Sequence, residues 1–378
     1  MILLTYSTSL AHANIQDSVV QSQVERLDLS QVEAFWKDLV NDYKGYLPGS
    51  EQQGIVTLMM NQDGEFSIKQ LFYGFLKFFF HEIVVNGKLL GTIIILTVFA
   101  MILETMQNAF EKNAVSKTAY AVSYIVLIIL AINSFRIAIG YAEEAISNMV
   151  NFMLALMPLV LAMLAAMGNL TSVAMFHPLI IFMVNVSGTV ILKVILPLLF
   201  LSSILSIVST ISDKYKVTQL ATLLRNISMG LLAAFLTVFL GIISVQGATS
   251  AVADGITIRT AKYVTSNFVP VVGRMFSDAT DTVLGATLLV KNGVGVVGVI
   301  ILILLCVFPA LKIFTLSLVY HFASAIMQPL GSSPIISCLS TIGKNLIFVF
   351  AALATVCLMF FLAITMIITA ANISVMVR

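Results

Sequence analysis

Two aspartates, Asp278 and Asp281, stand three residues apart in an otherwise apolar part of this chain. Paired carboxylates can bind a divalent cation or relay a proton. No histidine lies near them in the sequence, and Arg274, four residues before Asp278, is placed to pair with that aspartate on one helical face. We therefore interpret the aspartates as part of a charged surface and not as a metal site or a catalytic pair.

Arg259 and Lys262 add two basic groups shortly before these aspartates, on one face of a short predicted helix. Residues 246–292 thus form a charged hairpin between two long apolar segments. Ionisable groups in a membrane protein are costly and normally face water, a partner or a pathway. We predict that the hairpin lines a water-filled passage or docks a subunit, through the candidate residues Arg259, Lys262, Arg274, Asp278 and Asp281. A pair of exposed surface helices with one weak ion pair is the alternative interpretation.

The other chemical motifs in the sequence lack the context that their chemistry needs. Gly293, Gly295 and Gly298 have the glycine spacing of a dinucleotide-binding loop, but they open an apolar segment and no acid follows them. Close contact between helices explains these small residues better. The three cysteines lie singly in apolar surroundings, which predicts buried packing and neither a metal site nor a disulfide. We predict no enzymatic activity, no metal and no cofactor.

The composition indicates an all-α polytopic membrane protein. Hydrophobic residues make up 59% of the chain, charged residues 10%, and the mean hydropathy is +1.03. Soluble domains contain about 25% charged residues, and a membrane-crossing helix needs about 20 apolar ones. Apolar segments of this kind lie at about 89–106, 119–139, 149–167, 178–211, 227–245, 293–311 and 346–370. We expect six to eight crossings within a membrane domain that covers residues 89–378.

Residues 14–88 are predicted to form a small, helical extracytoplasmic head. Residues 1–13 end in an Ala-His-Ala sequence, which is typical of a signal-peptidase site and indicates the remnant of a signal peptide. The first 82 residues carry ten acids and five bases, whereas the rest of the chain carries eight acids and fifteen bases. Capping boxes at 30–33 and 67–70 predict two helix starts in the head, and Trp36 is expected to pack.

Four prolines suggest an internal repeat. Pro158 and Pro270 stand 112 residues apart, as do Pro197 and Pro309. We predict repeats at about 113–225 and 225–337, with all four prolines breaking helices. Repeats with broken helices build many transporter bodies.

Basic residues predict the orientation in the membrane. If the proline-containing stretches do not cross, six bases fall on the cytoplasmic side, as the positive-inside rule asks: Lys112, Lys117, Lys214, Lys216, Arg225 and Lys344. The same arrangement places Arg259, Lys262, Arg274 and Lys291 on the opposite side, where Asp254, Asp278 and Asp281 offset them in part.

The stretch from Gly247 to Gly298, with FVPVVGRMFSDATDTV at its centre, resembles the stage III sporulation protein AE family of endospore-forming bacteria. The resemblance extends to the layout of head and membrane body. It implies a non-enzymatic component of a transenvelope channel complex, in the mother-cell membrane around the forespore, that late forespore gene expression requires. The implied partners are other membrane and ring-forming proteins of the same operon and, on the forespore side, stage II sporulation protein Q. A free-standing secondary transporter or permease remains the alternative.

Overall fold

The computed structural model describes residues 27–47, 68–109, 114–210, 217–268, 272–330 and 334–376, without the side chains of 68, 107–109, 114–117, 248, 250–268, 272–284, 330, 370–371 and 373–376. All regular elements among these residues are helical, which confirms the all-α prediction. The main helices are α2 (Ser30–Asp42), α4 (Ile68–Ala109), α5 (Ala114–Ala166), α6 (Leu170–Val190), α7 (Leu196–Val208), α8 (Thr218–Phe268), α9 (Val272–Met327) and α10 (Pro334–Met376). A π-helical turn, Ile191–Ile195, joins α6 to α7, and a short 3-10 helix, Gln328–Leu330, follows α9.

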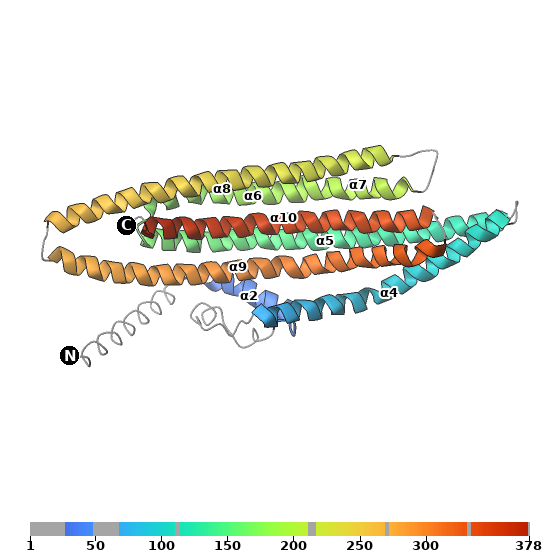
Figure 1. The fold of residues 1–378 in the computed structure, drawn as a ribbon, viewed down its shortest axis with the longest axis horizontal. Helices are drawn as coiled ribbons and strands as arrows, with labels where there is room; N and C mark the ends of the chain where they lie inside the picture. Colours follow the sequence, from blue (N-terminus) through green and yellow to red (C-terminus); the bar gives the residue numbers. More distant parts are fainter. Residues whose placement is uncertain are drawn as a thin grey trace.

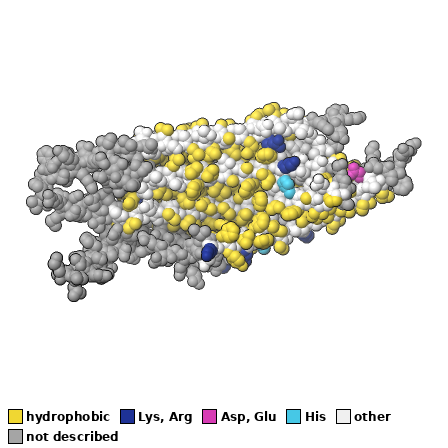
Figure 2. All heavy atoms as spheres, viewed as in Figure 1, with side chains coloured by type: hydrophobic (Ala, Val, Ile, Leu, Met, Phe, Trp, Pro, Cys, Tyr) yellow, Lys and Arg dark blue, Asp and Glu magenta, His cyan; other side chains and the backbone are white. Residues whose placement is uncertain are grey.

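Six helical segments in the described part of the chain are long and apolar enough to cross a membrane: Lys69–Met106, Thr118–Ala166, Leu170–Val208, Thr218–Gly247, Gly285–Met327 and Pro334–Thr369. The chain is therefore a multi-pass membrane protein. Residues 149–167, expected as a separate apolar segment, are instead the second half of α5. Figure 2 shows a wide band of hydrophobic side chains over the middle of the bundle, as a lipid-facing surface requires.

The long helices run alternately up and down the bundle, with α9 packed against α10, α5 and α4 (Figure 1). The links after α4, α7 and α9 lie at one end, whereas the turn between α5 and α6 lies at the other. The six basic residues assigned to the cytoplasmic side lie in the three links of the first end or in helix segments that adjoin them. This arrangement agrees with the positive-inside pattern, and the side of the membrane stays a prediction.

Two of the four prolines do not break their helices. α5 runs through Pro158 and α9 runs through Pro309 without interruption, so the predicted breaks at these positions are wrong. Proline removes one backbone donor, and neighbouring helices in a membrane bundle can stabilise the helix around that gap. Pro270 lies outside the described residues, between the end of α8 and the start of α9.

At Pro197 the helix changes its winding and continues. The π-helical turn Ile191–Ile195 comes directly before α7, in which Pro197 occupies the first turn. The wider turn accommodates a residue that cannot donate to the carbonyl four positions earlier, that of Lys193. The long apolar run is therefore one continuous helical path, in which the π-helical turn separates α6 from α7.

The helix predicted in the head is present, but its cap differs from the prediction. α2 begins at Ser30 and its N-cap position is Leu29, so Ser30 does not form a capping box. The carboxylate of Asp28 accepts hydrogen bonds from the Ser30 backbone N–H (3.2 Å) and hydroxyl (2.5 Å), which lowers the pKa of Asp28. Trp36 is buried, as expected. The capping box at 67–70 starts outside the described residues.

Small residues allow close contact between the long helices, as the glycine spacing predicted. A Cβ atom at Gly298 would lie 2.7 Å from the Leu156 side chain of α5, and one at Gly295 would overlap Ile368 of α10. Both distances are shorter than van der Waals contact. Cys306 and Cys338 are buried and Cys357 is half-buried, which agrees with a packing role.

Candidate functional site

The five predicted site residues lie where α8 and α9 meet. Arg259 and Lys262 belong to the last turns of α8, and Arg274, Asp278 and Asp281 belong to the first turns of α9. Figure 1 shows these two helices extending past the C-terminal end of α10 before they join. The hairpin is thus a projection from one end of the bundle. The side chains of all five residues lie outside the described part, so their predicted pairing stays a prediction.

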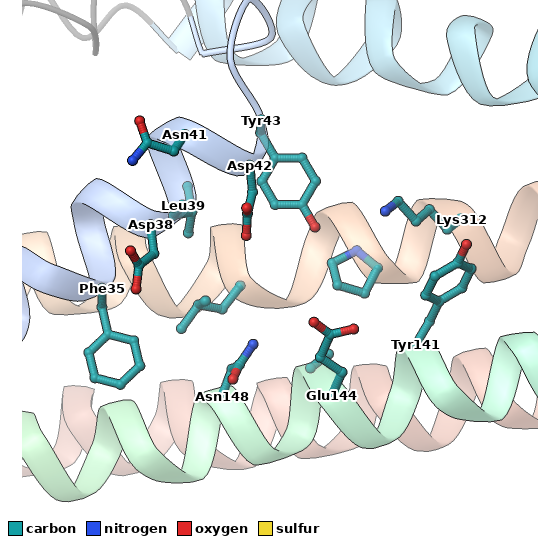
Figure 3. Close-up of a pocket in the computed structure, with 13 residues that line it drawn as sticks. Phe35, Asp38, Leu39, Asn41, Asp42, Tyr43, Tyr141, Glu144, Asn148 and Lys312 are labelled. Atoms are coloured by element: carbon teal, nitrogen blue, oxygen red, sulfur yellow. The ribbon is translucent and has the colours of Figure 1, made fainter.

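A cavity of about 690 Å³ with a polar lining lies between α2, α5 and α9. Its charged lining consists of Asp38 and Asp42 from α2, Glu144 from α5 and Lys312 from α9. Tyr43 and Tyr141 also line it. We call this site the Lys312 cavity and define it by Asp38, Asp42, Tyr43, Tyr141, Glu144 and Lys312. Figure 3 shows Asp42 and Glu144 extending into the cavity from opposite walls, with the ring of Tyr43 between Asp42 and Lys312.

Lys312 contacts the faces of two aromatic rings. Its Nζ lies 5.0 Å from the ring centroid of Tyr141 and 5.7 Å from that of Tyr43. The attraction of the ammonium to these ring faces offsets part of the free-energy cost of its desolvation. Pro309, three residues earlier in α9, also lines the cavity. The lysine is therefore held at the cavity wall by one tyrosine from the head and one from the membrane body.

Aromatic packing fixes the position of Tyr43. Its ring stacks on Phe308 of α9 at a centroid distance of 3.8 Å and meets the edge of Phe78 of α4 at 5.7 Å. Burial raises the pKa of Tyr43, and the nearby charges of Asp42, Glu144 and Glu82 and the Tyr141 phenol raise it further. Tyr43 is therefore a neutral phenol at physiological pH, and three carboxylates lie near enough to influence it.

A second, smaller cavity of about 190 Å³ adjoins the first and shares Tyr141 and Lys312 with it. Glu82 and Asn86 of α4 and Ser134 of α5 contribute polar groups to its lining. The Ser134 hydroxyl accepts a hydrogen bond of 2.8 Å from the buried Tyr320 phenol. Polar groups therefore continue from the head into the space between α4 and α5.

Lys291 is another lysine of α9, and it is fully buried. Its Nζ donates hydrogen bonds to the Ile368 carbonyl (3.0 Å) and to Oδ1 of Asn372 (2.5 Å), both on α10. A buried charge needs such partners to be tolerated. Because both partners belong to one neighbouring helix, Lys291 serves the packing of α9 on α10.

The sequence gives a weak signal for the Lys312 cavity. Lys312 is a lone charge in a long apolar segment, which is a reason to suspect function in a membrane protein. Its neighbours come from positions about 170 and 270 residues earlier, and no local spacing indicates that Glu144 and Tyr43 lie beside it. In the described residues, no three His, Cys, Asp or Glu side chains are placed to hold a metal ion.

A family model and a relative of known name both match this chain over most of its length. The family model for stage III sporulation protein AE matches residues 50–371. Stage III sporulation protein AE of Bacillus subtilis (strain 168) is 53% identical over 367 residues, which is 97% of this chain and 92% of that protein. No solved structure matches the chain.

Proposed function

Because the chain belongs to the stage III sporulation protein AE family, we propose that it is a membrane component of the transenvelope channel complex between mother cell and forespore. Its role in sporulation follows from the family. The family is not one of known enzymes, and the proposed role is non-enzymatic. The single observation that carries the proposal is the match to the family over nearly the whole of a multi-pass chain.

In this proposal the membrane body resides in the mother-cell membrane around the forespore, with the head between the two membranes. The charged hairpin, residues 246–292, is the surface that docks other subunits or lines the passage. Its projection beyond the bundle supports docking, because a projecting element is reached more easily by a partner. The proposed partners are the other membrane and ring-forming proteins of the same operon. Stage II sporulation protein Q is the proposed contact on the forespore side, directly or through the complex.

Affinity purification from sporulating cells tests this proposal. The tagged chain, solubilised in mild detergent after engulfment, should co-purify with the other proteins of its operon at similar abundance. A tagged, unrelated multi-pass protein of the same membrane is the control for detergent carry-over. Recovery of the chain without those proteins, both with and without chemical cross-linking, would argue against membership of a complex.

A free-standing secondary transporter is the second candidate, and the Lys312 cavity is the observation that favours it. Transporters bind solutes at polar groups between helices near the middle of their bundle. The purified chain in liposomes should then move a solute without any partner. Under the channel-complex proposal, liposomes that contain this chain alone should show no uptake above that of empty liposomes.

A further inference from the structure

Charges of opposite sign face the same open space in the Lys312 cavity. One ammonium, that of Lys312, stands on α9, whereas three carboxylates stand on α2 and α5. The contacts that the structure shows for the Lys312 ammonium are with two tyrosine rings, and these leave part of it facing the cavity. A ligand that complements this site therefore carries an anionic group for the lysine and cationic character for the carboxylates.

The number of charges of each sign limits which class of small molecule can fit the cavity. Three carboxylates and one ammonium give the lining a net charge of −2. A neutral zwitterion would offer a single cation to the three carboxylates, and a diamine would offer no anion to Lys312. A molecule with two cationic groups and one carboxylate can pair with Lys312 through its carboxylate and with two of the three lining carboxylates through its cations. A volume of about 690 Å³ lies within the range of small-molecule pockets.

We propose that the Lys312 cavity binds a cationic α-amino acid of the lysine and arginine class. The ligand carboxylate lies at Lys312 and the Tyr141 hydroxyl, the side-chain cation of the ligand lies at Glu144, and its α-ammonium lies at Asp42. Asp38, one helical turn before Asp42, adds a further carboxylate on the same wall. Because α2 supplies two of the carboxylates and Tyr43, the bound amino acid also joins the head to the membrane body.

The proposal concerns the chain itself and does not depend on the channel complex. Binding is measured on the purified full-length protein in detergent, without partners. A failure to bind would leave the co-purification result untouched, and a failure to co-purify would leave the binding result untouched. The two proposals can therefore be rejected separately.

Isothermal titration calorimetry with L-arginine is the first measurement, compared with two analogues that each lack one group. Agmatine lacks the carboxylate and L-citrulline lacks the side-chain cation. Because a hydrogen bond to a charged group contributes about a factor of ten or more, each analogue should bind about tenfold more weakly than L-arginine. No saturable binding of L-arginine up to about 10 mM, or equal affinity for all three compounds, would overturn the proposal.

Matched variants locate the binding. Glu144→Gln should weaken L-arginine and agmatine about tenfold and leave L-citrulline nearly unchanged. Glu143→Gln is the control, because Glu143 and Glu144 are both exposed neighbours on α5 and only Glu144 lines the cavity. Equal effects of the two substitutions would contradict the site, whereas an effect of Glu144→Gln alone supports it.

Lys312→Gln tests the other end of the cavity. It should abolish the preference for L-arginine over agmatine, because only the carboxylate distinguishes these two ligands. Lys312→Arg keeps the positive charge and should retain the preference. If Lys312→Gln fails to fold, as judged by size-exclusion chromatography, Lys312→Arg and Glu144→Gln still decide the outcome. A preference for L-arginine that survives in a folded Lys312→Gln protein would overturn the assignment.

Discussion

Lys291 and Lys312 are ionisable groups of the same apolar helix, but their surroundings differ. Lys291 is fully buried, and a backbone carbonyl and an amide oxygen of α10 accept its hydrogen bonds. Lys312 is half-buried beside two tyrosine rings at the wall of an open cavity. The first pattern is typical of a structural contact and the second of a binding site. Two lysines that look alike in the sequence therefore have different expected roles.

The structural role of Lys291 predicts an unequal response to two substitutions. Asn372→Ala should lower the free energy of unfolding by about 2 kcal/mol or more, because it leaves a buried ammonium with one partner fewer. Lys291→Met should be milder, since it removes the charge and keeps an apolar chain of similar length. Chemical unfolding in detergent measures both. A Lys291→Met protein that is less stable than Asn372→Ala would contradict this account of the contact.

The charged hairpin gives a prediction about Arg274 and Asp278 that rests on their spacing. Arg274→Asp and Asp278→Arg should each reduce sporulation efficiency, because each places two like charges four residues apart in α9. The double substitution restores opposite charges and should recover part of the loss. Heat-resistant spore counts measure the effect, with protein level checked by immunoblot. Full efficiency in both single variants would show that this charged face is not used.

At the scale of helices, the contacts of α9 depend on residues that the sequence suggests only in part. The glycine spacing predicted close helix contact, and Gly298 does lie against Leu156 of α5. Pro309 was predicted to end a helix, yet α9 continues through it because packing against three neighbouring helices outweighs the loss of one backbone donor. Local rules describe what a residue prefers, and they do not include the tertiary contacts that can override it.

For the same reason, the sequence predicts the fold class but does not predict the Lys312 cavity. The all-helical fold and the membrane class followed from composition and from the length of the apolar segments. The Lys312 cavity did not, because α2, α5 and α9 bring Tyr43, Glu144 and Lys312 together from separate parts of the chain. Ser30 shows the limit at a helix end, since its hydroxyl was expected to accept a hydrogen bond in a capping box and instead donates one to Asp28.

The contact at Gly298 predicts a size limit in α9. Gly298→Val should lower the free energy of unfolding by about 1–3 kcal/mol, because its side chain would enter the space of the fully buried Leu156. Gly241→Val in α8 is the control, since a Cβ atom there meets nothing within 4 Å. Adding Leu156→Ala should reduce the penalty of Gly298→Val. Equal penalties with and without Leu156→Ala would contradict this packing.

The docking of α2 predicts a specific effect of Phe308. Phe308→Ala removes the ring on which Tyr43 stacks and should destabilise the protein by about 3–5 kcal/mol. Hydrogen exchange in residues 30–42 should accelerate more than exchange in α10. Phe72→Ala, at a ring that is 67% exposed on α4, should change stability by less than about 0.5 kcal/mol. Unchanged exchange in α2 would show that Phe308 does not hold the head.

At the scale of the whole molecule, the helices are much longer than a bilayer is thick. The 56 residues of α9 extend about 84 Å, whereas the hydrocarbon core measures about 30 Å. Part of the bundle must therefore stand outside the hydrocarbon. The basic links gather at one end, and the charged hairpin lies at the other. We expect the hairpin end, on the same side as the head, to be the part that stands in water.

Cysteine accessibility of the hairpin tests this arrangement most directly. With the three native cysteines replaced, single cysteines would be placed across residues 256–284 and, as the opposite-side control, across 211–216. A membrane-impermeant maleimide applied to intact protoplasts of non-sporulating cells, which produce the chain in their plasma membrane, should label the hairpin positions and leave 211–216 unlabelled until the membrane is permeabilised. Hairpin cysteines that stay unlabelled before and after permeabilisation, or that react only from the cytoplasmic side, would contradict the account.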